Sequence, residues 1–385
     1  MRTAARTHTF TESMIREMTR VANRTGAVNL AQGFPDFAMP QAMKDAACAA
    51  IQRDVNQYAI TWGSTGLRRA IAEKYEQWYG MTVDTETEVT VCCGGTEAMA
   101  AVFLALVDPG DEVIVFEPYY ENYGPDAILS GAKPVYVPLE PPDWRMDPDR
   151  LREAFNRNTR AIVLNSPHNP TGRVFTRDEM ELIAALCIEH DALVFTDEIY
   201  EHIVYEGSHH VIATFPEMRE RTVTISGLSK TFSCTGWRLG YAIAPQALSL
   251  AIRKVHDFLT VGAPAPLQEA GAVGMRFGGD YYDGLAAEYR ARRDLIMPAL
   301  RDAGFECATP EGSYYVLADF SRLSDLPDVP FAMWLAEEGG IATVPGSTFY
   351  HDPELARRFT RFAFCKKLET LERAAERLSS LAARV

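Results

Sequence analysis

Hydrophobic and polar positions follow a regular order through the middle of the chain. Between Glu88 and Ile225, short apolar runs rich in β-branched residues are separated by longer segments with helical periodicity. The apolar runs lie at residues 88–93, 112–116, 135–137, 161–164, 192–196 and 222–225, with helical segments between them at 96–107 and 177–190. Two further helical segments, at 43–53 and 66–79, precede this region. Strands that alternate with helices predict an α/β fold, in which helices cover both faces of a mostly parallel sheet.

The two ends of the chain follow a different pattern. Helical periodicity over residues 10–22 is followed by a loop rich in glycine and proline at 29–37. After about Ala270, the pattern predicts helices at 281–303, 330–338 and 368–383, with short strands at 304–307, 313–319 and 361–365. We therefore expect three parts: an N-terminal segment, a large domain and a smaller α+β domain on which the N-terminal segment packs. Their expected ranges are 1–42, 43–280 and 281–385.

Composition narrows the class of protein. A chain of 385 residues is long enough for two domains, and its net charge of -14 disfavours nucleic acid as a partner, because phosphate binding needs a basic surface. The seven cysteines form no metal-binding pattern, so we expect no metal site and a reducing compartment. Residues 1–6 lack an apolar leader, and no segment approaches the roughly 18 apolar residues of a membrane span. These features predict a cytoplasmic protein with no membrane partner.

One lysine follows a predicted strand at the edge where a parallel sheet places its ligands. Lys230 comes after the strand at 222–225 and lies among small residues that include Ser226 and Ser229. Surroundings that lower its pKa would activate its amine for Schiff-base chemistry. Arg238, eight residues further on, could hold a phosphate with its planar fork of donors. A lysine in an ordinary solvated turn is the alternative.

Two more segments follow strands at the same predicted edge. Gly94-Gly95-Thr96 opens a helix, whose free N–H groups and Thr96 hydroxyl suit a phosphate; the alternative is an ordinary N-cap. The loop at 165–172 is made rigid by two prolines, and its Asn169 could donate a hydrogen bond to a ligand oxygen. A purely structural loop is the alternative there.

Two charged residues could meet opposite charges at this edge. Asp197 ends an apolar strand, where a carboxylate needs a cation such as a protonated pyridine nitrogen, and Tyr200 lies three residues on. Asp197 could instead cap the next segment. Arg361 alternates with aromatic residues and could grip a carboxylate in a cleft between the domains, or it could face solvent.

These segments occur in a characteristic order, Gly-Gly-Thr at 94–96, Asn-Pro-Thr-Gly at 169–172, Asp-Glu-Ile-Tyr at 197–200, Ser-Lys at 229–230 and Gly-Trp-Arg-Leu-Gly at 236–240. In this order the chain resembles the class I/II, fold-type I aminotransferases that depend on pyridoxal phosphate, from Asn29 to the C-terminus. The loop at 29–37 is similar to that of kynurenine/glutamine transaminases and methionine aminotransferases. The resemblance implies a large domain with a mostly parallel seven-stranded sheet that binds pyridoxal phosphate, a smaller α+β domain, and a homodimer with shared active sites.

The resemblance also implies roles for single residues. Lys230 would form an aldimine with the cofactor and move a proton, Asp197 would pair with the pyridine nitrogen, and Tyr200 would act with Asn169 on the phenolic oxygen of the ring. The residues implied to stack on the ring or to hold its phosphate are Tyr120, Gly95, Thr96, Ser226, Ser229, Arg238 and, reaching into the site of the other subunit, Tyr58. The residues implied to bind substrate are Ala31, Gly33, Asn169 and Arg361.

Two positions depart from the family pattern. Many relatives have a serine where this chain has Gly227, so either Ser226 substitutes for it or one phosphate contact is lost. Ala31 stands where glycine is common; its backbone N–H remains able to bind the substrate carboxylate, although its backbone is less free.

The implied activity is ping-pong transfer of an amino group from an L-amino acid to a 2-oxo acid. The loop at 29–37 favours aromatic, methionine-like or glutamine-like donors, and no second arginine is evident for a side-chain carboxylate. The same cofactor also supports β-elimination, cyclisation or oxygen-dependent oxidation of amino acids. A non-catalytic ligand-sensing domain is a further alternative, although no basic helix-turn-helix pattern occurs before residue 29.

Overall fold

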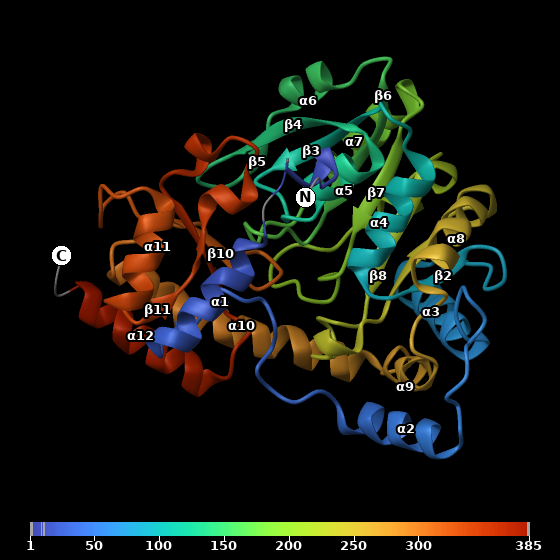
Figure 1. The fold of residues 1–385 in the computed structure, drawn as a ribbon, viewed down its shortest axis with the longest axis horizontal. Helices are drawn as coiled ribbons and strands as arrows, with labels where there is room; N and C mark the ends of the chain where they lie inside the picture. Colours follow the sequence, from blue (N-terminus) through green and yellow to red (C-terminus); the bar gives the residue numbers. More distant parts are fainter. Residues whose placement is uncertain (1–2, 9, 11, 383–385) are drawn as a thin grey trace.

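An eight-stranded sheet forms the centre of the molecule (Figure 1). In spatial order its strands are β2 (Val89–Cys92), β9 (Gly240–Ile243), β8 (Thr222–Gly227), β7 (Leu193–Asp197), β6 (Thr159–Asn165), β3 (Glu112–Glu117), β4 (Lys133–Glu140) and β5 (Arg145–Met146). Strands β9 and β5 run antiparallel to their neighbours, and the other six run in one direction. The α/β fold class is confirmed, and the two-residue β5 adds an eighth strand to the seven expected.

The computed structural model describes residues 3–8, 10 and 12–382. Residues 1, 2, 9 and 11 of the expected N-terminal segment and residues 383–385 of the expected smaller domain lie outside the described residues. Residue 11 belongs to the helix predicted at 10–22, and residue 383 to the last predicted helix. Among the residues described, no helix is long and apolar enough to cross a membrane.

Alternate residues of the central strands face two different helical layers. In β3, Val113 and Val115 pack in the cluster that includes α4 (Gly95–Leu106), whereas Ile114 and Phe116 pack in the cluster on the other face. Helices α5 (Tyr123–Ser130) and α8 (Gln246–Thr260) complete the first layer, and α6 (Pro148–Ala154) and α7 (Arg177–Glu189) form the second. Helices α2 (Gln41–Gln52), α3 (Thr65–Tyr79) and α9 (Ala265–Gly274) cover the end of the sheet at β2 and β9. This burial on both faces explains the continuous apolar runs of the sequence.

The C-terminal part is built around a three-stranded antiparallel sheet, β10-β13-β12. Its elements are α10 (Gly279–Asp302), β10 (Tyr315–Asp319), α11 (Asp328–Glu337), β11 (Ile341–Ala342), β12 (Val344–Pro345), β13 (Phe359–Ala363) and α12 (Leu368–Ala382). From the N-terminal segment, β1 (Val28–Asn29) pairs in parallel with β11, and α1 (Met14–Thr25) contacts α11. The domain boundaries at 42 and 280 stay a prediction. The strand predicted at 304–307 is wrong: this segment forms only a single bridge, between Glu306 and Asp319.

The remaining helical turns are short. They are η1 (Ala5–His8), η2 (Ile212–Thr214), η3 (Arg219–Arg221), η4 (Thr235–Trp237), η5 (Gly346–Phe349) and η6 (Pro353–Ala356). The turn η4 matters for the site, because it lies directly before β9. Since β9 runs against the parallel strands, it begins at the edge where they end. Arg238, two residues before β9, therefore lies at the same edge as the residues that follow β2, β3, β6, β7 and β8.

Candidate active site

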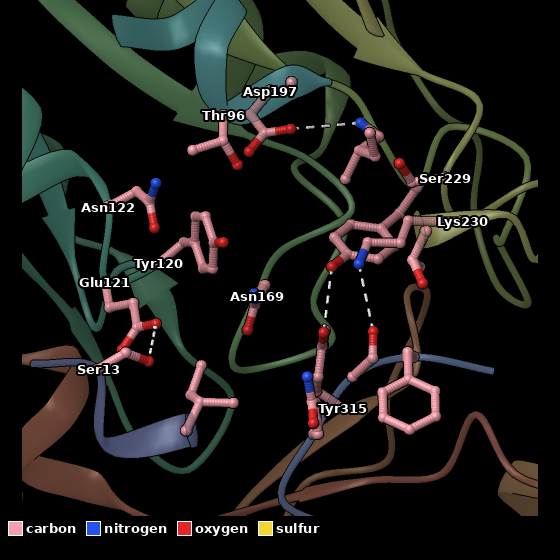
Figure 2. A pocket seen from close by; sticks show the side chains of 18 of the residues that line it. Ser13, Thr96, Tyr120, Glu121, Asn122, Asn169, Asp197, Ser229, Lys230 and Tyr315 are labelled. Atoms are coloured by element: carbon pink, nitrogen blue, oxygen red, sulfur yellow. Dashed lines mark hydrogen bonds between the residues drawn. The ribbon is translucent and has the colours of Figure 1, made fainter. Parts of the chain in front are cut away.

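A cavity of about 470 Å³ opens at this edge of the sheet (Figure 2). Most of the residues predicted for the site line it, from both the large sheet and the C-terminal part. They are Gly33, Gly95, Thr96, Tyr120, Asn169, Asp197, Tyr200, Ser229, Lys230, Arg238 and Arg361. Side chains separated by up to 328 positions in the sequence thus share one concave site, the arrangement expected for the carboxyl ends of parallel strands.

Lys230 has the electrostatic setting of a reactive amine. Burial, together with the nearby positive charges of Arg238 and Arg361, lowers the pKa of Lys230 to about 8, against the opposing effects of Cys365 and Asp197. Its Nζ donates a hydrogen bond to the carbonyl oxygen of Gly33 at 3.2 Å, which holds the side chain across the cavity. A large fraction of this amine can therefore lose its proton under mildly alkaline conditions, as a nucleophile or a proton carrier requires.

Asp197 lies at the end of β7 and is held by groups from three segments. Its carboxylate accepts a hydrogen bond from the hydroxyl of Tyr123 at 2.8 Å and one from the backbone N–H of Ile199 at 3.4 Å. Burial raises the pKa of Asp197, whereas the bond from Tyr123 acts in the opposite direction. The amide of Asn165 binds the Asp197 carbonyl at 2.7 Å and also accepts from the N–H of Asn169 at 2.7 Å. A half-buried carboxylate fixed in this way at the cavity wall favours a cationic ligand group.

The turn between β2 and α4 forms a cradle without side chains. Gly94 has a φ of +86°, and a Cβ built there would lie 2.4 Å from a guanidinium nitrogen of Arg238. A Cβ at Gly240 would lie 2.5 Å from the backbone of Gly94 and Gly95. Arg238 and the exposed Thr96 therefore border a bare backbone surface at the first turn of α4. This combination of free N–H groups, a hydroxyl and a guanidinium fits a phosphate group.

Arg361 is buried between aromatic rings on the other side of the cavity. Its Cζ lies 4.4 Å from the ring centroid of Tyr315 and 4.7 Å from that of Phe349. Its guanidinium donates to Asn169 Oδ1 at 3.0 Å and to the carbonyl of Ala31 at 2.9 Å, while its Nε has no partner among the described groups. Only 1% of Arg361 is exposed, so an anion that enters the cavity would meet a cation poorly screened by water.

Three predicted residues do not line the cavity. Ser226 is fully buried and its hydroxyl donates to Glu201 at 2.8 Å, so its expected help with phosphate does not fit. Tyr58 is 87% exposed and lies outside its own cavity. The N–H of Ala31 donates to Asn29 Oδ1 at 3.1 Å, so the carboxylate contact expected there would have to replace or share this bond and stays a prediction. A serine at Gly227 would be tightly packed, because a Cβ there would lie 3.0 Å from the Leu239 carbonyl oxygen and 3.0 Å from Ile199 Cδ1.

Several lining residues were not predicted from the sequence. The Tyr123 hydroxyl donates a hydrogen bond to the Asp197 carboxylate. The hydroxyl oxygens of Tyr315 and Tyr200 lie 3.2 Å apart. The first turn of α1 adds Arg16, and the segment after β3 adds Glu121. The order of the motifs gives no signal for these residues, because only the folded chain brings α1 to the mouth of the cavity. His168, expected to be a bystander, is buried against Thr171 at 2.8 Å and does not line it.

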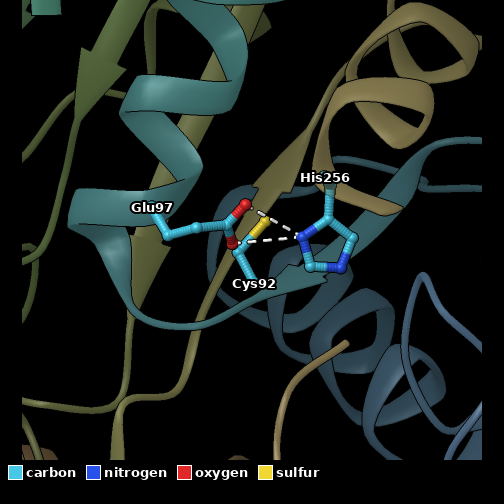
Figure 3. Close-up of side chains that lie close together, drawn as sticks. All are labelled: Cys92, Glu97 and His256. Atoms are coloured by element: carbon cyan, nitrogen blue, oxygen red, sulfur yellow. Dashed lines mark hydrogen bonds and ion pairs between the residues drawn. The ribbon is translucent and has the colours of Figure 1, made fainter. Parts of the chain in front are cut away.

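A cluster of Cys92, Glu97 and His256 lies behind the β2–α4 turn (Figure 3). Its ligand atoms lie within 4.8 Å of one another, which is close enough to surround a metal ion. However, His256 Nδ1 already binds Glu97 at 3.0 Å, and its Nε2 lies 2.9 Å from the carbonyl of Thr61. Burial alone would lower the pKa of His256, but the bonds to Glu97 and Thr61 raise it overall. These contacts form an ion pair between His256 and Glu97 next to the β2–α4 turn. The absence of a metal site stays a prediction.

Comparison with known proteins identifies the family. The family described as "Aminotransferase class I and II" matches residues 25–378. The methionine aminotransferase of Escherichia coli is 39% identical over 95% of both chains, and its crystal structure has a TM-score of 0.95 over 99% of this chain and 100% of its own. A probable N-succinyldiaminopimelate aminotransferase of Mycobacterium tuberculosis is 40% identical over 99% of both chains, and the structure of this Mycobacterium tuberculosis enzyme has a TM-score of 0.96. Human kynurenine–oxoglutarate transaminase 3 is 37% identical over 94% of this chain and 86% of its own.

The resemblance drawn from the motifs is thus confirmed over almost the full length of the chain. The phosphate cradle, the half-buried Asp197 and the lysine of lowered pKa fit pyridoxal phosphate, the cofactor of this family. The chain belongs to the class I and II aminotransferases and is a pyridoxal-phosphate-dependent enzyme of amino-group transfer.

Proposed function

We propose that this enzyme transfers the amino group of an L-amino acid to a 2-oxo acid by a ping-pong reaction at the cavity around Lys230. The observation that carries this proposal is the convergence of Lys230, Asp197, Arg238 and Arg361 on one cavity. An amine, a carboxylate and two separated guanidinium groups match the functional groups of a phosphorylated pyridine cofactor and an amino acid. When bound, pyridoxal phosphate supplies an electron sink for the substrate Cα.

The residues around the cofactor site hold charges and move a proton. We assign the phosphate to Arg238, Thr96 and the N–H groups at the start of α4, supported by the bare cradle at Gly94 and Gly95. We assign Asp197 to the pyridine nitrogen and Tyr120 to the face of the ring. Ser229, which lines the cavity, takes the helper role first considered for Ser226 as well.

Proton transfer at the substrate is assigned to Lys230. Because its pKa is about 8, Nζ can both accept and return a proton near neutral pH. Tyr200 and Asn169 line the same cavity, and we assign them to the phenolic oxygen of the ring. The hydroxyl pair Tyr200–Tyr315, 3.2 Å apart, fixes the orientation of the Tyr200 side chain.

Arg361 is assigned to the α-carboxylate of the substrate. A carboxylate can replace its bonds to Asn169 and Ala31 or share its donors with them, since a guanidinium offers five N–H groups. Gly33 lies near this position, where a side chain has no room. A Cβ at Gly33 would lie 1.9 Å from the hydroxyl oxygen of Tyr315.

Exposed apolar side chains support the homodimer expected from the sequence. Tyr58 is 87% exposed and Phe258 is 92% exposed, far more than large aromatic residues usually are in a monomer. The segments that carry these two residues are in contact. His256, two residues before Phe258, has its Nε2 2.9 Å from the carbonyl oxygen of Thr61, three residues after Tyr58. A second subunit on this surface would cover both rings and could bring its Tyr58 to the phosphate end of the cavity. Cytoplasmic location stays a prediction, supported by seven free cysteines.

The substrate class is proposed from the cavity and from the relatives. Aromatic, methionine-like or glutamine-like donors are favoured by the loop at 29–37, whose Phe34 lines the cavity. The relatives named for methionine and kynurenine support this range. To test it, the purified enzyme is given each L-amino acid with a 2-oxo acid acceptor, and the new amino acid is quantified. Transfer that requires the acceptor and is lost in Lys230→Ala is expected; ammonia or peroxide formed without an acceptor would contradict it.

A further inference from the structure

A buried ion pair lies next to the active site, between α3 and the turn that follows β7. The Lys74 Nζ donates to the Glu201 carboxylate at 2.5 Å, and both side chains are almost fully buried. Burial by itself would raise the pKa of Glu201 and lower that of Lys74, but the charge of each partner outweighs this effect, so Glu201 has a lowered pKa and Lys74 a raised one. Both groups are therefore charged at neutral pH. Neither lines the cavity, so the proposed reaction gives this pair no role.

The turn after β7 carries site residues and buried carboxylates together. Asp197 and Tyr200 line the cavity, whereas Glu201, the next residue, is directed to Lys74. The turn is neither helix nor strand. Its backbone bonds include one from the Glu201 N–H to the Glu198 carbonyl, at 3.0 Å. Such a turn lacks the repeated backbone bonds of regular structure, so side-chain contacts contribute more to its position.

The carboxylate of Glu201 collects donors from two other elements. One oxygen accepts from Lys74 and also from the Ser226 hydroxyl, at 2.8 Å. The second oxygen accepts from the Tyr79 hydroxyl at 2.6 Å. Lys74 and Tyr79 belong to α3, and Ser226 belongs to β8. Three directed hydrogen bonds thus fix one buried carboxylate, and with it the turn that carries Tyr200.

The same network reaches the strands that carry the other charged residues of the site. Ser226 lies in β8, four residues before Lys230. The Lys74 Nζ donates a second bond to the hydroxyl of Tyr241, at 3.2 Å, and Tyr241 lies in β9, three residues after Arg238. The ends of β7, β8 and β9 are therefore joined through one ion pair. This also gives Ser226 a role in place of the phosphate contact that does not fit it.

Resting on the proposed function, we infer that the Lys74–Glu201 pair is a positioning element, which sets Asp197 and Tyr200 relative to Lys230. Attraction within a buried ion pair is offset by the cost of removing both charges from water, so such a pair contributes little net stability. Its directed bonds, by contrast, permit few arrangements of the segments that they join. The pair acts through Asp197 and Tyr200 and does not touch the substrate. Small displacements of reacting groups are enough to slow catalysis.

Removal of one charge or of both separates position from stability. Lys74→Met leaves the Glu201 charge buried and unpaired, so the protein should unfold at a lower temperature. Lys74→Met combined with Glu201→Met replaces both charges by apolar side chains of similar size and should regain most of the lost stability. In this double variant, we expect kcat and the affinity for pyridoxal phosphate each to stay about tenfold below those of the unaltered enzyme. Thermal unfolding, steady-state kinetics of the cofactor-loaded enzyme and equilibrium dialysis measure the three quantities.

A substitution remote from the cavity controls for stability. Leu151→Ala opens a space in the core beneath α6, because Leu151 is fully buried there and does not line the cavity. It should lower the unfolding temperature and leave kcat and cofactor affinity unchanged.

Two milder variants keep the ion pair, and they test the inference even where the double variant does not fold. Ser226→Ala and Tyr79→Phe each remove one hydrogen bond to Glu201. Ser226→Ala detaches the turn from β8, which leads to Lys230, and should lower kcat about threefold to tenfold. Tyr79→Phe detaches it only from α3 and should have the smaller effect on kcat.

Three results would overturn the inference. A double variant that regains kcat and cofactor affinity together with its stability would show that the pair serves stability alone. Losses of kcat in Leu151→Ala as large as those in the double variant would have the same meaning. Equal values of kcat in Ser226→Ala and Tyr79→Phe would show that the link to β8 is without effect. Failure of the proposed function is separate, because an unaltered enzyme that transfers no amino group refutes the reaction, whereas cofactor affinity still tests the positioning role.

Discussion

Burial changes the chemistry of three side chains that the sequence already singled out. Lys230 has a lowered pKa, Asp197 a raised one, and Arg361 is almost inaccessible to water. Their types and positions were predictable, because each follows or lies on an apolar strand. Their partners were not: Tyr123 binds Asp197 across 74 positions, and Tyr315 meets Tyr200 across 115. Such contacts depend on packing between segments, and no local pattern encodes them.

The lowered pKa of Lys230 predicts how cofactor uptake depends on pH. A neutral amine attacks the cofactor aldehyde, so the cofactor-free protein should take up pyridoxal phosphate faster as pH rises, with a midpoint near 8. Absorbance of the bound cofactor, followed in stopped-flow mixing across a pH series, measures this rate. A midpoint close to 10.5, the ordinary value for lysine, would show that the site does not activate the amine.

The buried guanidinium of Arg361 predicts a strong effect of a substitution that conserves charge. Arg361→Lys keeps one positive charge but loses the planar pair of donors, so kcat/KM for amino donors should fall about 10²-fold. The KM for the donor and that for the oxo acid should both rise, because both carry the α-carboxylate. Arg358→Lys, three residues earlier and paired with Asp325 at 3.6 Å, serves as the control and should retain activity. An equal loss in both variants would indicate damage to the strand instead.

The turn from β2 into α4 shows how an element prepares a binding site. The strand and the helix were predicted within about one residue of their observed bounds, because the apolar pattern changes period there. The antiparallel β9 and the helices α8 and α9 were not predicted. Strand β9 is only four residues long, and its first residue, Gly240, is the last residue of the Gly-Trp-Arg-Leu-Gly motif. Its direction, which brings Arg238 to the site, follows from pairing with β2 and β8.

Alanine substitutions at Gly94 and Gly110 distinguish the effect of backbone strain from the effect of losing the phosphate cradle. Alanine at Gly94 would adopt a positive φ and would also displace Arg238, whereas alanine at Gly110, with a φ of +100°, meets no atom within 4 Å. Each substitution should cost about 1 kcal/mol of stability from strain. Only Gly94→Ala should weaken cofactor binding, by at least about tenfold. Thermal unfolding and equilibrium dialysis measure the two effects; equal cofactor affinity in both variants would contradict the cradle.

On the scale of the assembly, the exposed Tyr58 and Phe258 are the features that a single chain leaves unexplained. The prediction that Tyr58 reaches into the site of the other subunit came from the family resemblance, because no pattern in the sequence itself indicates that role. In the structure it lies outside its own cavity, as that role requires. If the proposed dimer forms, it would supply the Tyr58 contact to the phosphate that a single chain lacks.

Mixing two inactive or weakened variants tests the shared site. In a mixed dimer of Lys230→Ala and Tyr58→Ala subunits, one cavity carries both defects and the other carries neither. Subunit exchange between the two variants should therefore restore activity to well above the sum of the separate variants. Different affinity tags on the two variants, used in two successive purifications, would isolate the mixed dimers. Mixed dimers without any recovered activity would show that Tyr58 acts within its own subunit or not at all.

The most direct test of the central claim is the absorbance spectrum of the cofactor-loaded enzyme, recorded as one L-amino acid is added without an acceptor. We predict that the band of the enzyme-bound cofactor is replaced by that of its aminated form in one turnover per site, and that a 2-oxo acid then restores the original band. Lys230→Ala should not show this cycle. A spectrum that no amino acid changes, or a change that a 2-oxo acid never reverses, would contradict amino-group transfer at this site.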